Sequence, residues 1–239
     1  MKPTLVWFRR DLRVADNQAL KFAAERGSPI IPIYVWAPEE FGEQSPGAAS
    51  RLWLHHALEA LREDLLGLNL KLVLRKGQSS DVLLTLAKQT GADVLAYGQL
   101  LDPVEIQIET KVAQTLRSAG VSLQAFGGQL LAHPDSIKNG SGQPYKVFTP
   151  FWRKLSQTLR VSNPVLAPTQ VRAPTRWPKS ESLESFSLLS SLPWERQLGS
   201  HWSMSSIGGH ERLKEFAAQV SNYSVGRNQP SSDGVSRLS

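Results

Sequence analysis

The sequence predicts an α/β fold, a doubly wound five-stranded parallel sheet with helices on both faces, followed by a long linker and the start of a helical domain. Two observations lead to this prediction. Short apolar runs alternate with helical patterns over roughly the first half of the 239-residue chain, as expected for strands joined by right-handed helical crossovers. The runs are apolar almost without interruption, which is typical of parallel strands covered on both faces.

The predicted strands are the five apolar runs in the first half of the chain. The second run, IIPIYVW, illustrates the type, since it has no polar residue to face solvent. The five runs are residues 4–8, 30–36, 71–74, 94–97 and 121–126.

Helical patterns separate these runs. Asp16 is predicted to cap a first helix that extends through Arg26, with Gly27 as its stop. A third helix is predicted over residues 79–91 and a fourth from about Val104 to Gly120. On the long second helix, three- and four-residue spacing predicts an inner face. Its members are Leu52, His55, Leu58, Leu61, Leu65 and Leu66, and those of the fourth helix are Ile106, Val112 and Leu116.

The second half of the chain has a different character. Residues 163–192 are rich in Pro and Ser and show little periodicity, which predicts a surface connection. A helical pattern returns near Gly209. We therefore expect an α/β domain over residues 4–150 whose core is complete before about residue 150, a linker over 151–207, and the start of a helical domain over 208–239.

Composition limits the class of protein. Hydrophobic residues make up 41% and charged residues 20%, as in a globular chain with a buried core. No apolar run is long enough to span a membrane, and no leader pattern precedes the first strand, so a soluble cytoplasmic protein is expected. The absence of cysteine excludes disulfides, thiolate metal sites and a cysteine nucleophile. The net charge of +6 is compatible with a nucleic-acid partner but does not establish one.

The first turn after a strand carries the strongest candidate site. It contains no glycine-rich phosphate loop and instead reads Arg9-Arg10-Asp11-Leu12-Arg13. Because ligands of doubly wound sheets bind at the carboxyl ends of the strands, these arginines would hold an anion there. The alternative is that Asp11 pairs with a neighbouring arginine and fixes the turn.

Other chemistry-bearing residues favour structural roles. His55 and His56 are adjacent on the second helix and are expected to point apart, without a further ligand at metal-binding spacing, so no metal site is predicted. No Ser-His-Asp arrangement is recognisable. Seven tryptophans are many for this length; Trp7 and Trp36 belong to core strands and Trp53 to a helix.

An ordered set of segments resembles the photolyase/cryptochrome family from residue 4 to the end of the chain. The segments are residues 5–13 (LVWFRRDLR) with Asp16-Asn17, residues 45–51 (SPGAASR) with Trp53-Leu54-His55, residues 145–152 (YKVFTPFW), and Tyr223, Arg227 and Pro230 with residues 234–239 (GVSRLS).

The resemblance implies two cofactors and a DNA partner. In that family the helical domain binds FAD, and the α/β domain holds an antenna, either 5,10-methenyltetrahydrofolate or 8-hydroxy-5-deazaflavin. Glu105 stands where folate-using members place a carboxylate, Arg51 where deazaflavin-using members place an arginine, and Arg227 where the DNA backbone is contacted. The implied contacts to FAD phosphates are Tyr223, Val235, Ser236, Arg237, Leu238 and Ser239. Val235 departs from the usual threonine, and Leu100 and Val104 replace residues that are often polar in antenna-binding members.

The function implied by the resemblance is light-dependent DNA repair by a deoxyribodipyrimidine photo-lyase acting as a monomer on UV-damaged DNA. The chain ends inside the flavin motif, so we expect an N-terminal fragment that is inactive alone, with a poorly ordered tail over residues 223–239. Two alternatives remain, namely a cryptochrome blue-light photoreceptor and a free-standing α/β module that binds a nucleotide or chromophore.

Overall fold

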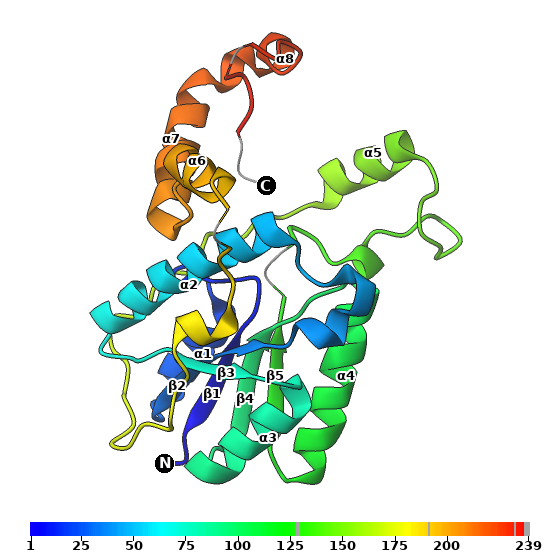
Figure 1. Cartoon of the computed structure of the whole chain (residues 1–239). Coiled ribbons are helices and arrows are strands. Elements are labelled where there is room, and N and C mark those ends of the chain that lie inside the picture. The colour runs from blue at the N-terminus through cyan, green and yellow to red at the C-terminus, as the bar shows by residue number, and fades with distance from the viewer. Residues whose placement is uncertain (128–129, 191, 232, 237–239) are drawn as a thin grey trace.

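The computed structural model describes residues 1–127, 130–190, 192–231 and 233–236. It contains a five-stranded parallel sheet of order β3-β2-β1-β4-β5, which confirms the predicted fold class (Figure 1). The strands are β1 (Thr4–Phe8), β2 (Ile30–Trp36), β3 (Val73–Lys76), β4 (Val94–Gly98) and β5 (Ser122–Phe126).

The strand order reverses direction next to β1. The chain first builds outward from β1 through β2 to β3, and then returns to the other side of β1 for β4 and β5. At this switch point Trp7 of β1 is in register with Ile33 of β2 and Tyr97 of β4. In such sheets the two crossovers that leave a switch point lie on opposite faces, which opens a crevice outside the carboxyl ends of the strands.

Four helices cover the two faces of the sheet. They are α1 (Gln18–Glu25), α2 (Ala48–Gly67), α3 (Ser79–Thr90) and α4 (Pro103–Ser118). Val6 and Phe8 point to the face packed by α1 and α2, whereas Leu5 and Trp7 point to the face packed by α3 and α4. This alternation follows from the two-residue period of a strand. Because both faces are covered, every residue of β1 and β2 is buried, as their apolar sequences predict.

Four local predictions about these elements are wrong. Leu66 of α2 is 46% exposed, because its neighbour Leu65 takes the core-facing position at this turn of the helix. The cap of α1 is Asn17, whose side chain accepts from the backbone N–H of Leu20 at 2.9 Å, because Asp16 adopts a positive φ of 52° outside the helix. The third strand lies two residues later than expected. Ile106 is 45% exposed, since α4 turns Glu105 and Ile108 inward instead.

The segment expected to be a surface connection contributes to the core. Leu183, Phe186 and Leu188 are each less than 5% exposed and pack in the cluster formed with α1 and α2. The backbone of the same segment joins the sheet edge, where Leu74 donates to Ser180 Oγ at 2.9 Å and Glu181 donates to the carbonyl of Leu74 at 3.0 Å. The core is therefore not complete before residue 150, although the domain limits 4–150, 151–207 and 208–239 remain predictions.

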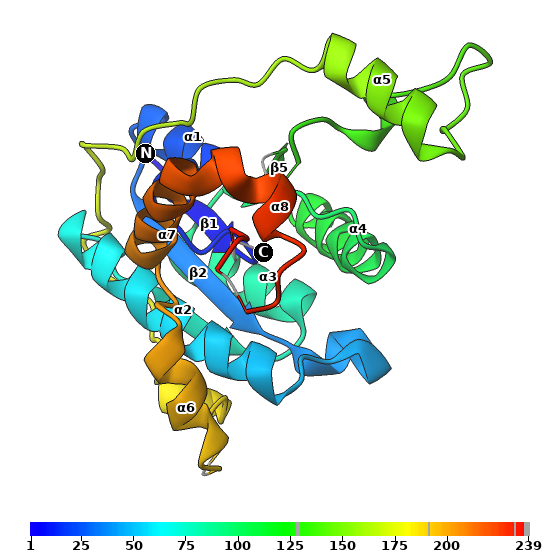
Figure 2. The ribbon, with the colours of Figure 1, turned by 90° about the horizontal axis from the view of Figure 1, so that it is seen from above.

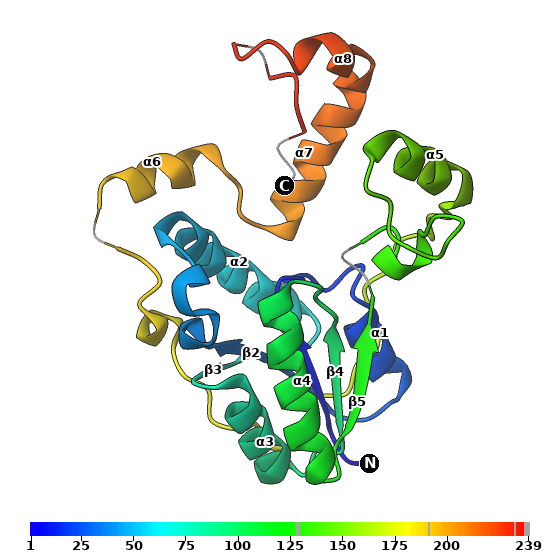
Figure 3. The ribbon, with the colours of Figure 1, turned by 90° about the vertical axis from the view of Figure 1, so that its right-hand side faces the viewer.

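The α-helices that follow β5 lie beyond the carboxyl edge of the sheet (Figures 2 and 3). The α-helices are α5 (Phe148–Thr158), α6 (Trp194–His201), α7 (Ser206–Gln219) and α8 (Tyr223–Gly226), and the short 3-10 helices are η1 (Pro38–Gln44), η2 (Pro134–Ser136), η3 (Leu183–Phe186) and η4 (Val220–Asn222). No helix within the described ranges combines the length and apolarity needed to cross a membrane.

Candidate functional site

A cleft of about 490 Å³ opens at the carboxyl ends of β1 and β2. Residues 7–10 and 34–37 form its floor, Trp53 of α2 forms one side, and residues 204–206 at the start of α7 close it from above. The volume lies within the range of small-molecule sites, and the walls are mainly aromatic and aliphatic with a few charged groups. The cleft therefore suits a flat, largely apolar ligand with polar edges.

Arg9 occupies the buried end of this site. Its guanidinium pairs with Glu105 through one nitrogen and with Glu109 through the other, and all three side chains are less than 10% exposed. Glu109 also accepts from the backbone N–H of Leu100 at 2.8 Å. Arg9 further lies over the ring of Trp7, at 4.5 Å from the centroid. Because each charge has a partner, the burial of three ionised groups is tolerated.

Arg10 brings a second, more exposed charge to the cleft. It pairs with Asp102 at 2.9 Å and with the second oxygen of Glu105 at 3.2 Å, while its side chain remains 55% exposed. Each oxygen of Glu105 thus faces an arginine, and Glu105 forms ion pairs with both Arg9 and Arg10. A carboxylate has about four lone-pair positions, so Glu105 retains capacity to accept from a ligand at the cleft that it lines.

Asp11 fixes the turn, but not by pairing with a neighbouring arginine. Its carboxylate accepts from the backbone N–H of Arg9 at 3.1 Å and from the side-chain amide of Asn17 at 3.4 Å. Arg13 pairs with Asp16 instead. A Cβ atom at Gly98 would lie 2.8 Å from Asp11 Oδ2, so the close approach of β4 to this turn requires glycine there.

The tyrosines beneath the cleft remain neutral at ordinary pH. Burial raises the pKa of Tyr34, which lines the cleft, and the charge of Glu105 raises it further. Burial also raises the pKa of Tyr97, and Glu109 adds to this effect. The charged groups of the cleft are therefore those of the arginines and glutamates that line it, and not the tyrosines.

Three other residues considered for the antenna site, Arg51, Leu100 and Val104, do not line the cleft. Arg51 is on α2, but the side chains that line the cleft from that helix belong to Ser50, Trp53, Leu54 and Ala57. The Nε atom of Arg51 is buried without a hydrogen-bond partner among the described residues. Leu100 is buried and Val104 packs against the core on the α3–α4 face, so neither offers a polar group to a ligand.

The implied flavin and DNA residues cluster at the far end of α7. Tyr223 is the first residue of α8, and the guanidinium of Arg227 lies 5.3 Å from its ring centroid. Arg212 of α7 binds the backbone beyond them, donating to the carbonyls of Val235 at 2.7 Å and Ser236 at 3.0 Å. Tyr223 and Arg227 thus contact each other, whereas Val235 and Ser236 are held by Arg212. The remaining three, Arg237, Leu238 and Ser239, lie outside the described residues.

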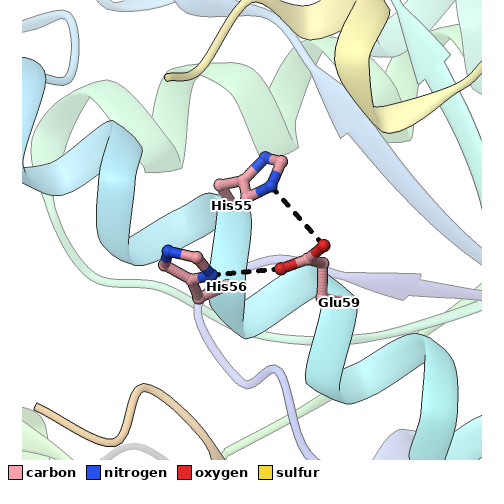
Figure 4. Close-up of side chains that lie close together, drawn as sticks. All are labelled: His55, His56 and Glu59. Carbon is pink, nitrogen blue, oxygen red and sulfur yellow. Dashed lines mark hydrogen bonds and ion pairs between the residues drawn. The ribbon is translucent and has the colours of Figure 1, made fainter. Parts of the chain in front are cut away.

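The expectation that His55 and His56 point apart is wrong. Their ring centroids are 5.2 Å apart, and both rings lie close to the carboxylate of Glu59 (Figure 4). Residues three and four positions apart share a helix face, so Glu59 stands at ligand spacing from both histidines. Glu59 is therefore a third potential ligand, and its i+3/i+4 spacing from the two histidines is visible in the sequence.

Sequence reasoning also missed the cleft residues that come from the distant parts of the chain. Trp53 contacts Trp202 at a centroid distance of 5.9 Å, and Met204 and Ser205 line the cleft beside it. These residues are about 150 positions apart. The signal that the sequence offered was a large aromatic residue, Trp53, at a position outside the predicted inner face of a leucine-rich helix.

The doubly wound sheet, with a cleft at the carboxyl ends of β1 and β2, defines an α/β domain of the class that binds ligands at this edge of the sheet. Comparison with known proteins narrows this class. The sequence matches DNA photolyase over residues 4–174, and the chain belongs to the DNA photolyase family.

Individual relatives agree with this assignment. A deoxyribodipyrimidine photo-lyase of Agrobacterium fabrum is 37% identical to this chain, and the match covers 99% of this chain and 49% of the photo-lyase. Cryptochrome-1 of Arabidopsis thaliana is 36% identical, and the match covers 70% of this chain and 25% of the cryptochrome. Among solved structures, a bacterial class III photolyase from Agrobacterium tumefaciens superposes with a TM-score of 0.94 at 36% identity, covering 100% of this chain and 49% of that one. The chain thus spans about half the length of the photolyases it matches.

Proposed function

We propose that this chain is the antenna-binding part of a light-dependent DNA-repair enzyme, a cytoplasmic deoxyribodipyrimidine photo-lyase that acts on UV-damaged DNA with FAD. The observation that carries the proposal is the cleft at the carboxyl edge, which joins a flat apolar floor to the charged groups of Arg9, Arg10 and Glu105. The photo-lyase of Agrobacterium fabrum, similar over nearly the whole chain, supports the same reading.

A reduced folate is the antenna that the cleft favours. A pterin ring requires an acceptor for its N–H groups, and Glu105 lines the cleft, whereas Arg51, the residue implied for a deazaflavin, does not line it. When bound, the antenna absorbs light and passes excitation energy onward. The chain's own contribution is to orient the ligand with Glu105, to cover its ring with Trp53, and to exclude water with Met204.

The FAD site is not complete within the described residues. Tyr223, Val235 and Ser236 offer one edge of a phosphate site, whereas a cofactor site buries most of its ligand. We therefore propose that the chain alone neither retains FAD nor repairs DNA. Purification without a stoichiometric yellow flavin, and no repair of a dimer-containing oligonucleotide under blue light, are expected; a bound flavin would overturn this part of the proposal.

The antenna proposal is tested by titrating the purified chain with 5,10-methenyltetrahydrofolate and, separately, with 8-hydroxy-5-deazaflavin, followed by fluorescence. The folate is expected to bind more tightly. Replacing Trp53 by alanine removes a stacking partner, which is worth about 1–3 kcal/mol, so affinity should fall by about five- to 150-fold. Trp152→Ala is the matched control, since Trp152 is 53% exposed on α5 and outside the cleft.

A second variant tests the role of the carboxylate. Glu105→Gln should weaken the folate and leave the deazaflavin unaffected, if the latter binds at all. Failure of both ligands to bind at tens of micromolar, a weak affinity, would refute the antenna proposal.

A cryptochrome is the second candidate, because Arabidopsis cryptochrome-1 is 36% identical over 170 residues. A free-standing module is the third. Reading the gene downstream of codon 239 separates the third from the other two: a continued frame that encodes a helical domain favours a photolyase or cryptochrome, and a stop codon favours the module. Repair of dimer-containing DNA by the product of a continued frame then identifies the photolyase.

A further inference from the structure

Three potential metal ligands converge on one side of α2, away from the cleft described above. His55 Nε2 lies 3.6 Å from one carboxylate oxygen of Glu59, and His56 Nδ1 lies 3.0 Å from the other (Figure 4). One ligand atom from each residue can be chosen so that all three lie within 4.8 Å of one another. Three donors are thus gathered within a single helical turn.

These separations match the requirements of a transition-metal ion. Zn²⁺ binds imidazole nitrogen and carboxylate oxygen at about 2.0–2.2 Å in tetrahedral geometry, which places neighbouring ligand atoms about 3.3 Å apart. The two measured separations bracket this value. Rotation of the Glu59 side chain, which is 43% exposed, is enough to turn one oxygen toward both rings. Two imidazoles and one carboxylate are also a ligand set that zinc proteins use.

The surroundings leave room for the remaining ligands. His56 lines a second cleft of about 540 Å³ together with Glu195 and Trp202, so open coordination positions would face water or the Glu195 carboxylate. Glu184 lies close enough to His55 to interact with it electrostatically, which adds negative charge near a bound cation. Arg62 is the opposing positive group nearby.

The two histidines differ in burial. The side chain of His55 is only 11% exposed, whereas that of His56 is 40% exposed. The alternative role for the cluster is a pairing of Glu59 with each histidine on the helix surface, through a hydrogen bond to His56 and a longer contact with His55.

We propose that His55, His56 and Glu59 form a binding site for one divalent transition-metal ion, with Zn²⁺ as the ion that the ligand set favours and with its open positions facing the cleft beside α6. The ion is held through Nε2 of His55 and Nδ1 of His56. It replaces the hydrogen bond between His56 and Glu59 and the longer contact of His55 with the same carboxylate, and it links the ends of one turn of α2.

The test uses the full chain, freed of any affinity tag and of metals by chelation. Titration with Co²⁺ should give the visible absorption of a nitrogen- and oxygen-bound ion that saturates at one ion per chain, and Zn²⁺ should abolish this absorption by displacement. Nitrogen-15 NMR of the imidazoles should show metal-induced shifts at Nε2 of one histidine and Nδ1 of another. No saturation below about 1 mM Co²⁺ would overturn the proposal.

Substitutions locate the ion on these residues. His56→Ala and Glu59→Gln change half-exposed side chains, so the fold should persist while metal affinity falls at least tenfold. His210→Ala is the matched control, because His210 is exposed on α7, and its affinity should equal that of the unchanged chain. Binding that survives both His56→Ala and Glu59→Gln, or that is lost in the His210→Ala chain, would place the ion elsewhere and refute the site.

Discussion

Replacing Phe186 by alanine tests whether the segment after residue 150 belongs to the core. Phe186 is 2% exposed and stacks against Trp36, with ring centroids 6.3 Å apart, while its contact with Tyr34 is 6.4 Å. Removal of a fully buried phenylalanine typically costs about 3–5 kcal/mol through lost transfer free energy and the cavity left behind. For a chain of this size, that corresponds to a fall in melting temperature of about 6–20 °C.

The assay is urea denaturation followed by circular dichroism. The midpoint should fall while the slope with denaturant concentration stays constant, since the change alters stability and not the surface exposed on unfolding. Phe148→Ala is the matched control, because Phe148 is 70% exposed on α5 and its loss should change stability by at most about 0.5 kcal/mol. Equal, small effects of the two substitutions would show that residues 183–188 do not contribute to the core.

Two further predictions concern charge. Arg9→Met leaves the carboxylates of the buried pairs without their partner and should destabilise the chain by about 3–5 kcal/mol. Arg10→Met changes a side chain that is 55% exposed and should cost less than about 1 kcal/mol in the same denaturation assay. Similar costs for the two substitutions would contradict the assigned network of ion pairs. Tyr34 and Tyr97 have raised pKa values in the folded chain, so the stability that they contribute is fully present below pH 10, their unfolded value, and is lost as pH rises further. Denaturation midpoints should therefore fall above pH 10, and absorbance at alkaline pH should show these two tyrosines ionising only on unfolding; a midpoint independent of pH in this range would contradict the burial.

Part of the candidate site could be predicted because its residues are neighbours in sequence. Arg9 and Arg10 follow a strand that is recognisable from its apolar pattern, and the carboxyl edge of such a sheet is where ligands bind. Arg9 pairs with Glu105, a residue that the resemblance had placed at an antenna site. Its second partner, Glu109, was not foreseen, because a charged residue on a helix is ordinarily solvated and nothing in the sequence marks it as buried.

The geometry of the histidine cluster was predicted wrongly for a different reason. His55, His56 and Glu59 lie within five residues of one another, so the information was present in the sequence. Adjacent helical residues diverge at the backbone, and this led to the expectation that the rings point apart. The side chains nevertheless bend toward the shared i+3/i+4 neighbour, a relation set by local helix geometry.

The sequence by itself determined the class of fold, the five strands and the helices that cover them, because the two- and 3.6-residue periods of apolar residues are local properties. Only the tertiary structure decided which distant segments complete the core and the cleft. Phe186 packs against Trp36, and Met204 closes the space above Trp53. These contacts join residues about 150 positions apart. Phe186 lies in the Pro- and Ser-rich region, which shows little periodicity, and the free energy of burying it depends on a surface that exists only after the sheet has formed.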